Sequence, residues 1–191
     1  ACVYGLKARL YMWVEQYDMA QQYARKAIEA AKVAPLTEGA ALSTTTGYNN
    51  ASNFMWSAAQ NSETYAVKTG IINWTSWVSN QTTFGYTGAS TSLYVVIDKS
   101  MYERISDTDW RKKQWVAPAG SALEGKTPFM SEADAATMPA YAAVKFRPAN
   151  GETLDYNIGN VTGVCVMRAE EMILTEIEAL AYTDPATAVA K

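Results

Sequence analysis

Histidine is absent from this sequence of 191 residues, and cysteine occurs only twice. Catalytic triads and imidazole metal sites both need a side chain that titrates near neutrality, so the absence of histidine excludes them. The two cysteines, Cys2 and Cys165, cannot build a zinc site, and their apolar surroundings favour buried free thiols over a disulfide. We therefore expect no metal and no cofactor.

Charge is also scarce, since 16 basic and 19 acidic residues leave a net charge of -3. The sequence has no long basic run, so we expect no nucleic-acid partner. No apolar stretch reaches the roughly 18 residues that span a bilayer. The sequence opens inside a predicted helix without a charged leader or a cleavage pattern, so we expect an internal fragment of a longer protein.

Phenylalanine is the least frequent aromatic residue, with 4 copies against 6 tryptophans and 12 tyrosines. Rings with a polar edge are favoured where a surface is partly wet and binds another molecule. Almost half of all residues, 49%, are apolar, which is ordinary for a folded protein. The composition therefore predicts a globular chain with an aromatic binding surface.

The first 32 residues predict two antiparallel helices, because small and aromatic residues recur there at helical spacing. These residues are Tyr4, Ala8 and Tyr11 in the first helix, and Ala20, Tyr23, Ala24, Ala27, Ile28 and Ala31 in the second. Asp18 is the expected N-cap of the second helix, and Pro35 is expected to end it. The pattern resembles a tetratricopeptide unit, although an ordinary helical hairpin fits the same spacing.

Residues 71–92 form the most unusual segment, because aromatic rings alternate there with Asn, Thr, Ser and Gly and no residue is charged. A long irregular segment of this kind is often functional. Aromatic faces can stack on the C–H faces of a sugar, while neutral amides can bond its hydroxyls. We therefore predict a ligand site in which Trp74, Trp77 and Tyr86 stack on the ligand and Asn73 and Asn80 hydrogen-bond it. The alternative is that the tryptophans fix the loop to the core.

Shorter elements are expected between the hairpin and the end of the chain. Phe54, Met55 and Trp56 predict an element that packs on the hairpin, with Trp56 in the core. A helix is expected near Ser100, and the alternation over residues 141–147 predicts a short strand.

Two acidic residues follow the helix near Ser100. Asp107 and Asp109 resemble the carboxyl pair of a glycosidase, but acidic pairs at helix ends are more often caps or partners of basic neighbours such as Arg111 and Lys112.

A final amphipathic helix is predicted from Val166 to Tyr182. The pair Asp184 and Pro185 should then open a further helix.

Four separated motifs occur along the chain, namely residues 6–11 with residues 17–20, Asn53-Phe54-Met55-Trp56, Asp109-Trp110-Arg111, and residues 167–179. In this order they resemble the SusD/RagB-like family of glycan-binding lipoproteins from the Bacteroidota. The chain departs from the family pattern at Glu170 and Ile177, where alanine is usual, and at Trp110, where proline is common. The resemblance spans most of the chain and is most specific at its two ends. In the C-terminal motif, Arg168 and Glu171 are spaced to pair.

This resemblance implies a mainly α fold of TPR-like α-hairpins in an α/α superhelix, with long irregular loops. Residues 1–191 would form one incomplete domain, with a hairpin at 1–33, a loop-rich insertion at 34–165 and the start of a further hairpin at 166–191. The family implies glycan capture on the extracellular face of the outer membrane, without catalytic residues. The family also implies a SusC-like TonB-dependent transporter as partner, and contact with the membrane only through an N-terminal lipid anchor that we expect to lie outside this sequence.

Two other functions remain open from the residues themselves. A TPR-like scaffold for protein–protein interaction would use the hairpin surface around Tyr4, Arg9 and Tyr11. A carbohydrate-active enzyme would need Asp107, Asp109 or Glu170 in a cleft.

Overall fold

The computed structural model begins with the predicted antiparallel hairpin and describes residues 1–69, 71–88 and 90–191. Helix α1 spans Cys2–Trp13, and helix α2 spans Tyr17–Ala31. Small residues line the contact between the two helices, where Ala8 of α1 and Ala20, Ala24 and Ala27 of α2 are fully buried. Because small side chains let the backbones approach closely, the tyrosines pack around this contact rather than within it.

The start of α2 differs from the prediction. The helix begins at Tyr17, with Gln16 at the N-cap position and no side-chain cap, so the prediction of Asp18 as the cap was wrong. Asp18 lies in the first turn, where a carboxylate still interacts favourably with the helix dipole. The ring of Tyr17 stacks on Tyr182 with 4.0 Å between the ring centroids, which favours the earlier start.

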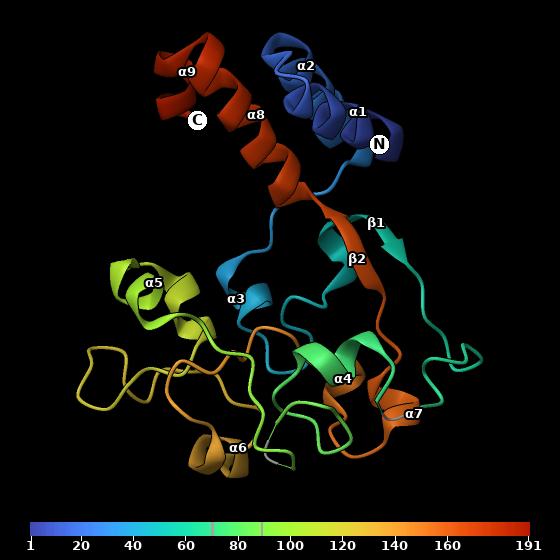
Figure 1. Cartoon of the computed structure of the whole chain (residues 1–191), viewed down its shortest axis with the longest axis vertical. Coiled ribbons are helices and arrows are strands. Elements are labelled where there is room, and N and C mark those ends of the chain that lie inside the picture. Colours follow the sequence, from blue (N-terminus) through green and yellow to red (C-terminus); the bar gives the residue numbers. More distant parts are fainter. Residues whose placement is uncertain (70, 89) are drawn as a thin grey trace. The chain divides into compact units, whose positions relative to one another are not determined.

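The last predicted helix is preceded by a strand. Strand β2, Val164–Arg168, pairs with strand β1, Phe54–Ala58, and leads directly into α8, Ala169–Thr183 (Figure 1). The helix therefore starts three residues later than Val166. Asp184 caps the short helix α9, Pro185–Ala190, which confirms the predicted further helix.

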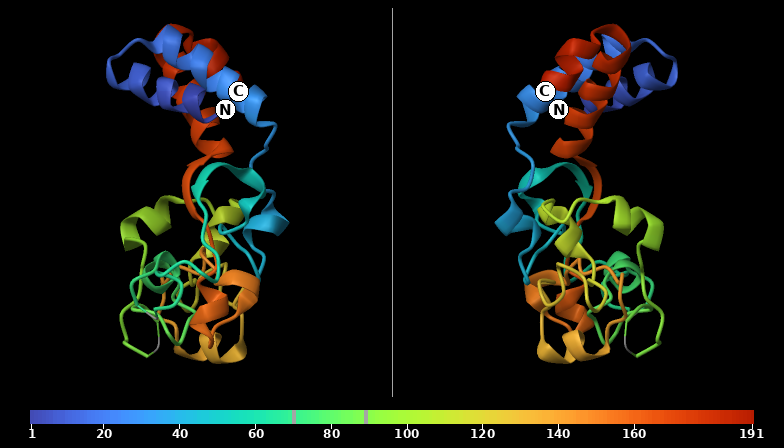
Figure 2. Two further views of the ribbon diagram at one scale, coloured as in Figure 1. Left: turned by 90° about the vertical axis from the view of Figure 1, so that its right-hand side faces the viewer. Right: turned by 90° about the vertical axis from the view of Figure 1, so that its left-hand side faces the viewer.

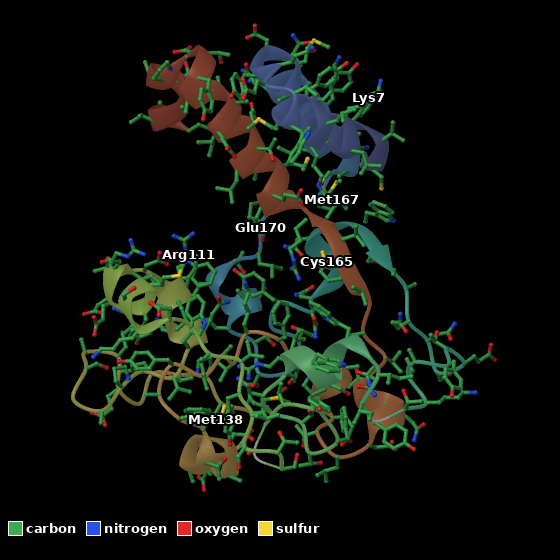
Figure 3. All side chains as sticks on the ribbon, in the orientation of Figure 1. Lys7, Arg111, Met138, Cys165, Met167 and Glu170 are labelled. Carbon is green, nitrogen blue, oxygen red and sulfur yellow. The ribbon has the colours of Figure 1, made fainter. Side chains whose placement is uncertain are left out.

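Helix α8 packs along α2, and both views in Figure 2 show these helices side by side. The shared core contains Ala8, Ala24 and Ala27 from the hairpin, and Met55, Met167 and Met172 from β1, β2 and α8. Figure 3 shows Met167 on β2, with Cys165 two residues before it and Glu170 at the start of α8. The expected contact of residues 54–56 with the hairpin is confirmed through Met55.

Trp56 was expected in this core, but it is 41% exposed. Successive side chains of a strand point to opposite faces, so burying Met55 turns Trp56 outward. The prediction of a core role for Trp56 was wrong.

The chain divides into two compact units. The helical unit comprises Ala1–Leu36, Ala51–Ala58 and Cys165–Lys191, and the loop-rich unit comprises Thr37–Asn50 and Ala59–Val164. The short 3-10 helix η1, Ala51–Asn53, belongs to the helical unit. The loop-rich unit contains α3 Glu38–Ala41, α4 Trp74–Val78, α5 Lys99–Arg104, η2 Trp110–Gln114, α6 Glu132–Thr137, η3 Ala149–Gly151 and α7 Tyr156–Gly159.

Three short extended segments pair with one another inside the loop-rich unit. Residues 141–144 lie between residues 95–97 and residues 114–116, with isolated bridges from Val96 to Ala142 and from Trp115 to Ala143. The predicted strand over 141–147 is thus replaced by extended chain with isolated bridges, because each neighbouring segment pairs with it over only a few residues. Met138, Ala142 and Val144 form a small core beside this ladder.

The interior of the loop-rich unit is unusually polar. Buried side chains include Asn73, Thr75, Ser76, Ser79, Asn80, Gln81, Thr82, Gln114, Arg147 and Asn160. Irregular backbone leaves many amide and carbonyl groups without a ladder partner, and Asn73, Asn80, Thr82, Arg147 and Asn160 hydrogen-bond backbone groups of this kind. Among the described residues, no helix has the length and apolarity to cross a membrane.

Candidate functional site

The aromatic segment folds around the short helix α4. Asn73 is the N-cap of this helix, where its side-chain oxygen accepts a hydrogen bond from the amide of Ser76 at 2.9 Å. The amide group of Asn73 also donates to the carbonyl of Thr69 and to the Ser76 hydroxyl, both at 2.8 Å. These bonds fix the direction in which α4 leaves the loop, and with it the direction of both tryptophans.

The chain after α4 turns back and is bonded to the helix. The carbonyl of Ser76 accepts hydrogen bonds from the amides of Tyr86 at 2.8 Å and Thr87 at 3.2 Å. Gly85 is needed at this turn, because a Cβ there would lie 2.4 Å from the hydroxyl of Thr82. The backbone of Tyr86 is therefore held against α4 by main-chain contacts.

This return places the ring of Tyr86 on the ring of Trp77. Their centroids are 4.5 Å apart and their planes differ by 18°, which is a stacked pair. Trp77 is 52% exposed and Tyr86 is 43% exposed. The structure thus brings together two of the predicted stacking residues in an exposed pair, which we call the aromatic platform.

Trp74 has a different position from Trp77. It is half-buried, and its ring meets Phe146 edge to face with 5.7 Å between centroids. This contact fixes α4 to the extended chain around Phe146. Trp74 thus fixes the loop to the rest of the unit, whereas Trp77 is exposed and available to a ligand.

Asn80, like Asn73, is buried. Its amide group donates to the carbonyls of Val95 and Ala143, and its side-chain oxygen accepts from the amide of Val95, each at 2.9 Å. The predicted hydrogen bonds from Asn73 and Asn80 to a ligand do not fit this burial, because both side chains bond the protein's own backbone. We therefore restrict the site to the aromatic rings.

The segment that carries the platform is uncharged. The sequence from Thr69 to Ile97 contains no charged residue. Sequence reasoning did not single out Ile71 and Ile72, which are 52% and 56% exposed and precede α4. Hydropathy alone gives no signal for such exposure, because isoleucine is usually buried.

The acidic residues considered for catalysis are engaged in ion pairs. Asp109 caps η2 and binds the Arg111 guanidinium at 2.6 Å, a hydrogen bond that holds the pKa of Asp109 below its usual value. Asp107 pairs with Lys112 at 2.7 Å. These contacts match the expected caps and basic partners, and a carboxyl group with a lowered pKa is a poor general acid.

Glu170 has a structural position in the helical unit. Its carboxylate accepts two hydrogen bonds from the side chain of Asn53 at 2.7 Å and one from the amide of Leu36 at 2.8 Å. It therefore holds three separate segments of the unit together. This explains why a glutamate, rather than the alanine usual in the resembling family, fits this position.

The hairpin residues considered for a peptide-binding scaffold contact their own unit. Arg9 binds Glu171 and the carbonyl of Val166, each at 2.7 Å, and the rings of Tyr4 and Tyr11 both pack on Tyr23. Glu171 therefore has Arg9 as a partner. Arg168, which is spaced to pair with Glu171, donates to the side-chain oxygen of Asn53 at 3.2 Å and lies over the ring of Phe54.

Both cysteines are free thiols, as expected, but both are partly exposed rather than buried. Burial raises the pKa of Cys165, and the thiol of Cys2 donates to the carbonyl of Met55 at 3.1 Å. Within residues 1–69, 71–88 and 90–191, no cluster of three Cys, Asp or Glu residues is placed to hold a metal ion. Ala89 of the aromatic segment lies outside the described residues.

Fold and site together define a mainly α protein in which a layer of helical hairpins is joined to a loop-rich unit that carries exposed aromatic rings. No family model and no curated protein matches the sequence.

A solved structure is similar in fold, namely a SusD-like carbohydrate binding protein from Bacteroides vulgatus ATCC 8482. The two chains are 17% identical with a TM-score of 0.63, over 98% of this chain and 34% of that chain. The chain therefore has a SusD-like fold and spans about a third of the length of the solved protein.

Proposed function

We propose that this protein binds oligosaccharides or polysaccharides without catalysis, and that Trp77 and Tyr86 form the surface on which the sugar stacks. The observation that carries the proposal is the exposed, stacked ring pair, held by backbone hydrogen bonds within an uncharged segment. The similar solved protein is named as a carbohydrate binding protein, which supports the same class of ligand.

The chemistry of the platform suits a neutral ring. The faces of Trp and Tyr carry partial negative charge, which attracts the weakly positive C–H groups on one face of a pyranose. A rigid platform loses little conformational entropy on binding, because its backbone is already ordered. An open surface of this kind binds weakly, with a dissociation constant on the order of 10 μM to 1 mM, or about 4 to 7 kcal/mol.

The cellular role is the finer part of the proposal. We place the protein on the extracellular face of the outer membrane, as a SusD/RagB-like lipoprotein that passes glycans to a SusC-like TonB-dependent transporter. The four sequence motifs and the SusD-like fold support this role. Co-purification of the protein with such a transporter from solubilised outer membranes would test it.

Affinity electrophoresis against a panel of plant, host and microbial glycans tests the binding function. We expect at least one glycan to retard the wild-type chain, and we expect Trp77→Ala and Tyr86→Ala each to weaken that retardation about tenfold. Matched controls are Trp13→Ala and Tyr65→Ala, because these rings are 86% and 76% exposed and lie outside the platform.

Two outcomes of this experiment would contradict different parts of the proposal. If no glycan in the panel retards the protein, the proposed function is wrong. If a glycan binds and the Trp77 and Tyr86 variants behave like the two control variants, the function stands but the platform is not its site.

A further inference from the structure

A tight turn lies within the 3-10 helix η3. Asn150 has a φ of 56° and a ψ of 15°, and Gly151 follows it with a φ of 70°. Two consecutive residues in the left-handed region are typical of a type I′ turn, for which Asn-Gly is a preferred pair. The amide of Glu152 closes the turn on the carbonyl of Ala149 at 3.0 Å. Asn150 and Gly151 are therefore the two central residues of this turn.

The order of these two residues permits a reaction of the chain with itself. The backbone nitrogen of Gly151 can attack Cγ of Asn150, so that a new C–N bond closes a succinimide ring and the side-chain nitrogen leaves as ammonia. Water then opens the ring at either carbonyl and gives aspartate or isoaspartate. Glycine favours the attack, because it has no Cβ beside the nitrogen. The sequence contains Asn-Gly at this position alone.

The side chain of Asn150 is exposed, and no described residue forms a hydrogen bond with it. It can therefore rotate toward the nitrogen of Gly151. Most other asparagines are held by hydrogen bonds of their side chains, namely Asn49, Asn53, Asn61, Asn73, Asn80, Asn157 and Asn160. The remaining one, Asn50, precedes alanine rather than glycine. Asn150 thus combines a free side chain with a following glycine.

The attacking nitrogen is weakly held as well. The amide of Gly151 donates to the carbonyl of Pro148 at 3.2 Å, which is at the long end of the range for an N–H···O bond. A Cβ built on Gly151 would have its nearest heavy atom, in Met130, at 3.6 Å. No other segment is therefore pressed against this residue, and the turn can adjust without displacing its neighbours.

We propose that Asn150 is a site of spontaneous modification, where the Gly151 nitrogen and water convert the amide to isoaspartate and aspartate, and that its free side chain selects it. Both products add a negative charge two residues before Glu152. Isoaspartate also lengthens the main chain inside the turn. The carbonyl of Thr153 accepts the amide of Thr83 at 2.9 Å, so the altered turn lies next in sequence to a contact of the aromatic segment. The reaction needs only water, so it does not depend on glycan binding.

Peptide mapping by tandem mass spectrometry tests the site on the full 191-residue chain. The chain is incubated at about pH 8 and at about pH 5, because the attacking nitrogen loses its proton more readily at the higher pH. We expect the acid form at Asn150 to accumulate about tenfold faster than at Asn61 or Asn157 in the same sample, and faster at the higher pH. Labelling by an isoaspartyl methyltransferase should detect isoaspartate in the same peptide.

Ser62→Gly is the matched control, because it creates a second Asn-Gly pair whose asparagine is held. The side-chain oxygen of Asn61 accepts hydrogen bonds from the amides of Glu63 and Thr64, each at 3.0 Å. We expect Asn61 in this variant to react about fivefold more slowly than Asn150, because those bonds must break first. Asn150→Gln should remove the modification from its own peptide, since the longer side chain closes the ring less readily.

A synthetic peptide of residues 147–153 gives the rate of the reaction without the fold. If the folded chain keeps Asn150 intact while this peptide is largely converted, the turn protects the residue and the proposal is wrong. Equal rates at Asn61 and Asn150 in the Ser62→Gly variant would overturn the selection by a free side chain.

Discussion

Replacement of Asn80 by alanine separates a structural role from a role in ligand binding. In the structure the side chain makes three hydrogen bonds, two to Val95 and one to the carbonyl of Ala143. The carbonyl of Val95 keeps the amide of Ala143 as a partner, whereas the amide of Val95 and the carbonyl of Ala143 lose the only partners that the structure shows for them. The Asn80→Ala variant therefore leaves two backbone groups unpaired.

The expected destabilisation follows from the burial of these two groups. Val95 is 40% exposed, so water can replace part of its lost bond, and about 1 kcal/mol is expected there. Ala143 is only 7% exposed, and an unsatisfied buried carbonyl costs about 1 to 3 kcal/mol. The free energy of unfolding of the loop-rich unit should fall by about 2 to 4 kcal/mol, a large part of a typical domain's stability.

Urea unfolding followed by tryptophan fluorescence measures this loss, because Trp74 and Trp77 report on the loop-rich unit. At low temperature, where the variant is still folded, its affinity for a bound glycan should stay within about twofold of wild type. If the variant is as stable as wild type but has lost glycan binding, Asn80 contacts the ligand and its role is not structural.

The Asn80→Asp variant adds a pH dependence with a definite sign. The introduced carboxylate would face two carbonyl oxygens in a buried place, so its pKa in the folded state should rise above the unfolded value of about 3.9. Folding then favours the protonated form. The variant should be most stable below pH ~4 and lose stability as the pH rises through the raised pKa, and a stability that rises with pH relative to wild type would contradict this reasoning.

Three further predictions concern stability. Glu176 is 1% exposed and pairs with both Arg25 and Lys191, so only the loss of both cations leaves a buried charge unpaired. Arg25→Met with Lys191→Met should destabilise the helical unit by about 1 to 2 kcal/mol in thermal unfolding, and by more than the same pair of substitutions combined with Glu176→Met; equal losses would count against a buried unpaired charge as the cause. Gly47 has a φ of +49° and would bring a Cβ within 2.6 Å of a carbonyl oxygen, so Gly47→Ala should cost about 1 to 3 kcal/mol in urea unfolding, and an unchanged midpoint would refute the strain. Hydrogen bonding from Ser100 lowers the pKa of Asp98, so the ionised carboxylate stabilises the folded state above the unfolded pKa of Asp98. This stability is lost as the pH falls through the lower folded pKa. Asp98→Asn should therefore remove this pH-dependent part of the acid-unfolding curve, and an unchanged curve would contradict the role of Asp98 as a helix cap.

The long periodic helices could be predicted from the sequence because their pattern is local. Ala20, Ala24 and Ala27 repeat at helical spacing, and all three are buried. The start of α8 could not be placed in the same way, because Val164–Arg168 becomes a strand only by pairing with Phe54–Ala58, more than a hundred residues earlier. Single-sequence periodicity carries no information about such a distant partner.

The candidate site was predicted in part for a similar reason. The sequence singled out the segment that carries the exposed ring pair, because clustered aromatic residues without charge are a local feature. It did not distinguish Trp77 from Trp74, since the difference depends on Phe146 on another segment. The exposure of a loop side chain depends on which distant segment the loop packs against, and the local sequence does not show this.

The polar residues of the aromatic segment have a physical explanation that does not involve a ligand. A unit with little regular secondary structure must satisfy its backbone groups by other means, and short amide and hydroxyl side chains are suited to this task. Asn73, Asn80 and Thr87 all bond backbone carbonyls inside the loop-rich unit. The abundance of Asn, Thr and Ser is therefore a requirement of the irregular fold, so it cannot also count as support for sugar binding. That support comes instead from Trp77 and Tyr86, because an irregular backbone gives no reason to leave two stacked rings exposed.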